Sequence, residues 1–189
     1  MAKVKFISSE YLKENTPIDG NVSTTLLEPF IIKAQDIHIQ QCLGTKLYEA
    51  IKALIVAGTI GDGGNVNYKA LLDNHIRPTL SEWVLYESMP FIGFKLTNKS
   101  VSQKSSEDSQ PTGLDEIKWL RQSVRDSAEF YTKRMSNYLS QYQNLFTELT
   151  TSTDISEMKP FGKSYFGGVY LGRTGKQFNE GRGNGNYDI

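Results

Sequence analysis

Apolar residues recur at three- and four-residue steps through most of the first 150 positions, which is the spacing of one helical face. After an extended start, Ser8 or Ser9 can cap a short helix that Pro17 and Gly20 end. The first long helix is predicted up to Gly44, with Thr25 and Glu28 in the spacing of a capping box and Pro29 in the first turn. Its apolar face consists of Leu26, Leu27, Phe30, Ile31, Ala34 and Ile37. Thr45 then caps a second helix, which ends at Gly58 and a glycine-rich surface loop.

A third helical region is predicted over residues 68–96, divided at Pro78 because proline lacks an amide donor. Its second half is apolar on almost every side, which is typical of a helix at the centre of a bundle. Residues 99–113 are polar and rich in serine, so they cannot bury enough surface to offset the entropy of ordering. We expect a mobile loop there.

The strongest pattern is a heptad seam over residues 114–149, which predicts a helix on the order of 50 Å long at ~1.5 Å per residue. Such a helix is longer than a small bundle needs, and two interpretations stay open: part of the seam packs on a neighbouring subunit, or all of it packs on its own bundle. The candidate subunit-interface residues are Tyr131, Met135, Tyr138 and Tyr142. The seam consists of Leu114, Ile117, Arg121, Val124, Ala128, Tyr131, Met135, Tyr138, Tyr142, Leu145 and Leu149, and only Arg121 breaks it.

The composition changes after Thr150, where glycines alternate with aromatic residues and basic residues exceed acidic ones. Such a segment is costly to order alone but offers aromatic anchors, so we expect an extended arm that orders against a partner. Folding back on its own helices is the alternative. The sequence therefore divides into a helical domain at 1–150 and a C-terminal arm at 151–189. The candidate partner-binding residues of the arm are Phe161, Tyr165, Phe166, Val169, Tyr170, Arg173 and Phe178.

Gly162, Lys163 and Ser164 suggest a phosphate-binding loop, but the surrounding sequence argues against one. A P-loop needs a glycine where Glu157 stands, with a buried strand before it and a helix after it. The pair Gly167 and Gly168 instead predicts the turn of a small β-hairpin.

Composition and charge limit the classes of function that this chain could have. The 21 basic and 21 acidic side chains cancel, so the chain lacks the positive field of a general nucleic-acid binder. The single Cys42 cannot form an internal disulfide and is interpreted as an inert packed thiol, and we expect neither a signal segment nor a membrane span. His38 and His75 are interpreted as capped or surface residues. No acid–base pair is defined, so we predict no catalytic residue, no cofactor and no metal site, and expect a non-enzymatic protein.

Four stretches carry a family resemblance: EYLKENTPI, LLEPFIIKAQD, LLDNHIRPTL and LDEIKWLRQ. Through them, residues 4–150 resemble the ring proteins, or head-to-tail connectors, of crAss-like tailed bacteriophages. More loosely, the chain is similar to the helical adaptors that sit beneath the portal of many tailed phages. These stretches mark a fold rather than an active site.

The resemblance implies an all-α fold: a helical bundle with one extra-long C-terminal helix and a glycine- and aromatic-rich arm. It further implies a structural virion protein, assembled in the host cytoplasm, that forms a dodecameric ring in the neck and binds the portal protein and adjacent ring proteins. Genomic DNA would pass through the lumen without specific binding. The alternatives are another neck or tail-completion protein, or a small regulatory or nucleic-acid-handling helical protein with a mobile basic tail.

Overall fold

The structure is a computed structural model, and it describes residues 3–96, 101–103, 114–150 and 157–160. Most of these residues are helical, which confirms the all-α prediction. The α-helices are α1 (Ser9–Asn15), α2 (Thr24–Ala34), α3 (Gln40–Val56), α4 (Val66–Leu71), α5 (Arg77–Gly93) and α6 (Leu114–Gln141). Two π-helical turns, η1 (Gln35–Ile39) and η3 (Leu72–Ile76), and three 3-10 turns, η2 (Gly63–Asn65), η4 (Gln143–Leu145) and η5 (Thr147–Leu149), complete the helical elements.

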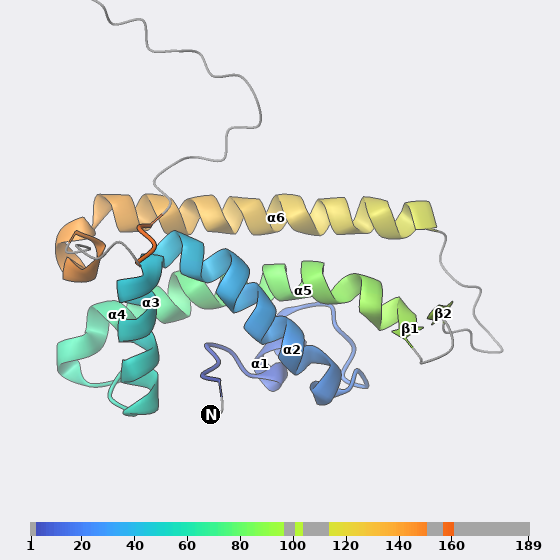
Figure 1. Cartoon of the computed structure of the whole chain (residues 1–189), viewed down its shortest axis with the longest axis horizontal. Coiled ribbons are helices and arrows are strands. Elements are labelled where there is room, and N and C mark those ends of the chain that lie inside the picture. The colour runs from blue at the N-terminus through green and yellow to red at the C-terminus, as the bar shows by residue number, and fades with distance from the viewer. Residues whose placement is uncertain (1–2, 97–100, 104–113, 151–156, 161–189) are drawn as a thin grey trace, which may run out of the picture.

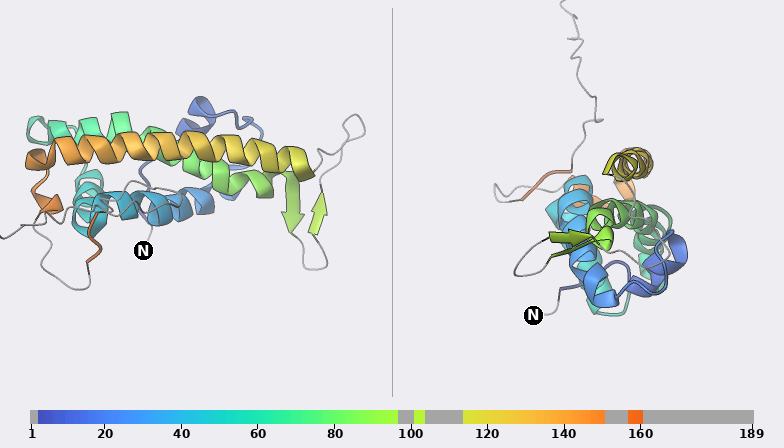
Figure 2. Two further views of the ribbon diagram at one scale, coloured as in Figure 1. Left: turned by 90° about the horizontal axis from the view of Figure 1, so that it is seen from above. Right: turned by 90° about the vertical axis from the view of Figure 1, so that its right-hand side faces the viewer.

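Helix α5 lies at the centre of an elongated bundle (Figures 1 and 2). Helix α6 runs alongside it on one side, and α2 packs against it on the other. The central position predicted for the apolar second half of the third helical region is therefore confirmed. Its physical basis is that a helix without a polar face must be covered on several sides. The buried side chains that join these helices include Leu27, Ile31, Leu80, Val84, Ala128 and Met135.

The start of α2 differs from the predicted capping box. Ser23 is the N-cap residue, so α2 begins at Thr24 and Pro29 lies inside the helix rather than in its first turn. The carboxylate of Glu28 is turned away from the helix end, because it pairs with the ammonium of Lys5 at 2.7 Å. The ion pair with Lys5 therefore uses the Glu28 carboxylate that the predicted capping box would have required.

The interruption predicted at Gly44 is present, whereas the division predicted at Pro78 is not. Gly44 has φ 74° and ψ 164°, so the predicted interruption at this position is confirmed, inside α3. Pro78 lies in the first turn of α5, directly after η3, and the helical path from α4 to α5 continues through that π-turn. Proline has no amide hydrogen to donate to the preceding turn, and the wider π-turn accommodates this loss without ending the helix.

Two predicted boundaries after α5 were wrong. The third helical region ends at Gly93, and β1 (Phe94–Leu96) pairs antiparallel with β2 (Val101–Gln103), with Lys95 opposite Ser102. Strand β2 thus falls inside the segment predicted as a mobile loop. The two strands pair through backbone hydrogen bonds, and the side-chain pattern of the sequence does not predict such short strands.

Helix α6 has 28 residues and ends at Gln141, not near Leu149. The chain leaves helical geometry at Tyr142 (φ −114°) and continues in η4 and η5. This turn carries Phe146 into the core, where its ring contacts Tyr68 at 5.5 Å between centroids. Burial of one large aromatic residue therefore ends the helix earlier than the heptad pattern predicts. The arm and its predicted hairpin lie almost wholly outside the described residues.

Candidate subunit interface

The heptad seam of α6 faces its own bundle. Met135 is 0% exposed, so its assignment to a subunit interface was wrong: it belongs to the core between α6 and the rest of the chain. Tyr138 stacks on His75, with ring centroids 4.1 Å apart, and is likewise held within the chain. The reason is that the apolar surface of α5 left uncovered by α2 requires a partner helix, and α6 supplies it.

Polar contacts fix the pairing of α5 and α6. The indole Nε1 of Trp83 donates to Oγ1 of Thr132 at 2.8 Å. The guanidinium of Arg121, the residue that breaks the seam, lies over the ring of Tyr86 at 4.2 Å from its centroid. Arg121 therefore takes a seam position without interrupting the contact, because its planar cation packs on an aromatic face.

The other two candidate interface tyrosines are less enclosed. Tyr131 is partly buried beside Phe130, at 5.6 Å between ring centroids, and Tyr142 is exposed at the end of α6. These two positions remain accessible to a partner, although they belong to the seam that packs inward.

The side of α6 opposite the seam carries an apolar patch. Trp119 and Phe130 are 73% and 65% exposed, and Leu120 is also exposed. Trp119 and Phe130 are eleven residues apart, close to three helical turns, so they share one side at a separation of roughly 16 Å. Trp119, Leu120 and Phe130 are called the outer patch below.

Polar side chains lie between and beside the residues of the outer patch. Gln122 donates to Asp126 at 2.8 Å, and Arg125 pairs with Glu129 at 2.8 Å. Large aromatic residues exposed on a helix face among polar side chains are typical of a protein–protein contact surface. The heptad seam does not reveal this site, because Trp119 and Phe130 lie off the seam; their eleven-residue spacing was the available signal in the sequence.

Two further exposed apolar residues lie elsewhere on the bundle. Val56 and Val66 are exposed at the two ends of the connection between α3 and α4. In Figure 1 this connection is at the lower edge of the molecule, whereas α6 forms the upper edge. These two valines are called the loop patch. Two different patches on separate sides suit a head-to-tail contact, in which unlike surfaces of identical subunits meet.

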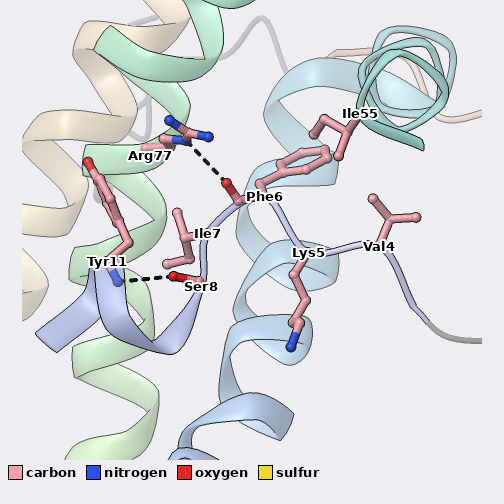
Figure 3. Close-up of a pocket in the computed structure, with 8 residues that line it drawn as sticks. All are labelled: Val4, Lys5, Phe6, Ile7, Ser8, Tyr11, Ile55 and Arg77. Carbon is pink, nitrogen blue, oxygen red and sulfur yellow. Dashed lines mark hydrogen bonds between the residues drawn. The ribbon is translucent and has the colours of Figure 1, made fainter. Parts of the chain in front are cut away.

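The N-terminal segment borders a groove of about 430 Å³ between α1, α3 and α5 (Figure 3). Its polar groups are already engaged: Nε of Arg77 donates to the carbonyl of Phe6 at 3.3 Å, and the Ser8 hydroxyl accepts from the Tyr11 amide at 3.1 Å. Asp73 and Glu28 neutralise Arg77 and Lys5. The groove therefore holds no convergent acid and base.

Both histidines occupy the fourth position of a π-turn with the sequence Asp-x-His-Ile, a repeat that the sequence analysis did not note. His38 stacks on Trp83 at 3.7 Å and bonds Glu87 at 3.2 Å. Burial is the main cause that lowers the pKa of each histidine, and for His75 the charge of Arg134 lowers the pKa further. The expectation of capped or surface histidines holds only in part, because both rings are partly buried and stacked on an aromatic side chain.

Cys42 is buried, as expected for a packed thiol. Burial raises the pKa of its thiol to about 11, so the reactive thiolate is scarce at neutral pH. Among the residues that the structure describes, no group of three or more His, Cys, Asp or Glu side chains could hold a metal ion. Within the same ranges, none of the helices combines the length and apolarity needed to cross a bilayer.

The candidate partner-binding residues of the arm lie outside the described residues: Phe161, Tyr165, Phe166, Val169, Tyr170, Arg173 and Phe178. The part of the arm that is described, residues 157–160, lies against α3 at Gly44.

A family model described as a family of unknown function, DUF6712, matches residues 39–157. The chain belongs to this family. The DUF6712 match runs from the last residue of η1 to the first residue of the described segment at 157–160, and so includes α5, α6 and the outer patch. Neither the curated proteins nor the solved structures include a match to this DUF6712 chain.

Proposed function

We propose that this chain is a structural virion protein that forms a ring in the neck of a tailed bacteriophage, between the portal of the head and the tail. The observation that carries the proposal is the outer patch on α6. It exposes two large aromatic residues on a helix whose opposite side packs against the core. The resemblance of residues 4–150 to crAss-like phage ring proteins supplies the functional class.

The proposed subunit contact is head to tail. The outer patch of one copy packs on the loop patch of the next, and repetition of this unlike contact closes a ring when the rotation per subunit divides a full turn. A formal net charge of zero supports close approach of identical copies, since no long-range repulsion opposes it. In this proposal α6 serves as the long helix of the connector and displays the outer patch.

The C-terminal arm is the proposed docking element for the portal or an adjacent ring. Its aromatic residues would provide anchors, each contributing on the order of 1 to 2 kcal/mol at a buried interface. A ring presents the same arm in every subunit, so modest contacts would sum to strong avidity. DNA would pass through the lumen without being bound.

The test compares assembly of the full chain with that of a double variant, Trp119→Ala with Phe130→Ala. Ser140→Ala with Gln141→Ala is the matched control, because both of these residues are exposed at the end of α6, ten or more positions beyond Phe130. We expect rings of the wild type and the control by electron microscopy and native mass spectrometry, alone or with portal. The aromatic double variant should keep the helical circular dichroism spectrum and remain monomeric.

Two results would overturn the proposal. One is a wild-type chain that stays monomeric at high concentration and with portal present. The other is ring formation by the aromatic double variant at the wild-type level, which would remove the outer patch from the contact.

A second candidate is a regulatory or nucleic-acid-handling role, favoured by the basic excess of the tail, where Lys163, Arg173, Lys176 and Arg182 outnumber Glu180 and Asp188. Binding of DNA that weakens steeply between about 50 and 200 mM salt would support it. If DNA does not bind, or binds equally well at all salt concentrations, this second candidate is excluded and the connector role remains the proposal.

A further inference from the structure

Helix α3 contains a backbone break at a position where another part of the chain approaches closely. Gly44 is buried and has φ 74°, in the region that favours glycine. The helix resumes at Thr45, whose amide would lack an intrahelical partner because it stands at the start of the resumed segment. Residues 157–160, more than a hundred positions later, satisfy it.

Two reciprocal hydrogen bonds join Thr45 to Met158. The amide of Thr45 donates to the carbonyl of Met158 at 3.0 Å, and the amide of Met158 donates to Oγ1 of Thr45 at 3.0 Å. Lys46 pairs with Glu157 at 3.5 Å. The Met158 side chain is itself exposed, so recognition is by the backbone and by the flanking acid.

The absence of a side chain at Gly44 makes room for this segment. A Cβ at residue 44 would lie 2.8 Å from Cδ of Pro160 and 3.0 Å from both the carbonyl oxygen of Met158 and the nitrogen of Pro160. Two of these three atoms belong to the backbone and cannot turn aside. Any residue other than glycine would therefore push the segment off α3.

We propose that Gly44 and Thr45, with Lys46 beside them, form a binding site for an extended acidic-x-x-Pro peptide, occupied in this chain by its own residues 157–160. This clasp fixes the position of residues 157–160, the last described part of the chain. It holds the base of the arm by backbone hydrogen bonds and by shape, whatever sequence follows. The inference does not depend on ring formation.

Gly58 provides a matched control. It also has a positive φ, 70°, but a Cβ there would meet nothing within 4 Å. Alanine at either position carries the same left-handed backbone strain, whereas only alanine at 44 collides with residues 158–160. The difference between the two variants isolates the clasp from the general cost of replacing glycine.

The first experiment measures hydrogen exchange of the full chain by mass spectrometry, on peptides that cover residues 157–162. We expect Thr45→Val, which keeps the shape but removes the acceptor, to speed exchange of the Met158 amide about tenfold. Gly44→Ala should speed it by at least as much. Gly58→Ala and Thr45→Ser, which retains the hydroxyl, should match the wild type.

The second experiment measures where the base of the arm lies. Spin labels at Glu49→Cys on α3 and Lys159→Cys, both exposed positions, give an electron paramagnetic resonance distance distribution; the buried Cys42 is protected from labelling. The distribution should be narrow in the otherwise wild-type chain and broad after Thr45→Val. Unchanged exchange and an unchanged distribution in the Thr45→Val chain would overturn the proposal, even if Gly44→Ala fails to fold.

Discussion

A single buried amide side chain ties the N-terminal segment to the bundle. Oε1 of Gln35 accepts from the Phe6 amide at 2.9 Å, and its Nε2 donates to the Val4 carbonyl at 3.0 Å and to the Tyr48 hydroxyl at 2.9 Å. Gln35 is the first residue of η1, so the π-turn directs a polar side chain inward at a point where an extended segment needs partners. The segment thereby pairs with a side chain rather than with a strand.

Replacement of Gln35 by methionine should lower the free energy of unfolding by about 2 to 4 kcal/mol. The change keeps the volume but leaves the Phe6 amide and the Val4 carbonyl without partners, at about 1 to 3 kcal/mol for each buried unsatisfied group. Urea unfolding followed by circular dichroism measures it. Gln41→Met, at an exposed position of α3, is the control and should change stability by less than about 0.5 kcal/mol. Equal effects of the two variants would contradict the role of Gln35.

The stability of the protein should depend on pH through His75. Burial and Arg134 lower the pKa of His75 below its ordinary value of 6.5 in the folded chain, so the unfolded chain takes up the proton first as the pH falls. The free energy of unfolding should therefore decrease between about pH 7 and pH 5. His75→Phe keeps an aromatic ring against Tyr138 and removes the titration, so its decrease over this range should be smaller.

His38 remains in both chains and contributes a decrease of the same sign, so the comparison isolates His75. Burial raises the pKa of Glu87, but its bonds to Lys33 and His38 together outweigh burial and lower that pKa below its ordinary value. The stability that this carboxylate adds is therefore lost only below about pH 5. Parallel stability curves for the wild type and His75→Phe, measured by denaturant unfolding at each pH, would refute the prediction.

At the scale of elements, α6 has two sides with different roles. The inner side closes the core through Ala128 and Met135, both fully buried, and the outer side displays Trp119 and Phe130. Removing an inner side chain leaves a cavity, whereas removing an outer one changes a surface.

We therefore expect Met135→Ala to lower the free energy of unfolding by about 2 to 4 kcal/mol, within the range for large-to-small core changes. Phe130→Ala, on the same helix, should change it by less than about 0.5 kcal/mol in the monomer. Thermal and denaturant unfolding at low protein concentration measure both. A large loss of stability for Phe130→Ala would show that the outer patch is covered within the chain itself.

At the scale of the whole molecule, the described segment at 157–160 divides the C-terminal arm into a part held by the clasp and a part beyond it. A chain ending at Pro160 should unfold with a free energy within about 0.5 kcal/mol of the full chain, since the clasp is retained. A chain ending at Thr150 should lose about 0.5 to 1.5 kcal/mol with the clasp hydrogen bonds.

Both shortened chains should keep their helical circular dichroism, yet neither should join portal complexes, because the proposed docking residues are removed from each. Calorimetry and co-sedimentation with portal measure the two effects separately. A loss of several kcal/mol on ending at Pro160 would show that the arm folds back on the bundle. Unchanged portal binding would show that docking lies elsewhere.

Local pattern in the sequence was enough to predict the helical class, the central position of α5, the break at Gly44 and the packed state of Cys42. These features follow from periodicity and from the backbone preferences of single residues, which act over a few neighbouring positions. The resemblance to phage connectors and the assignments to the arm remain predictions.

Tertiary structure alone decided which side of α6 is buried, where that helix ends and what Gly44 accommodates. The heptad seam predicted a packing surface but not its partner, because α5 and a neighbouring subunit would present equally apolar faces. Helix α6 ends early because the ring of Phe146 packs in the core against Tyr68, 78 positions away in the chain. The clasp joins Thr45 to Met158, and contacts at such separations depend on the path of the folded chain rather than on any local preference of the residues.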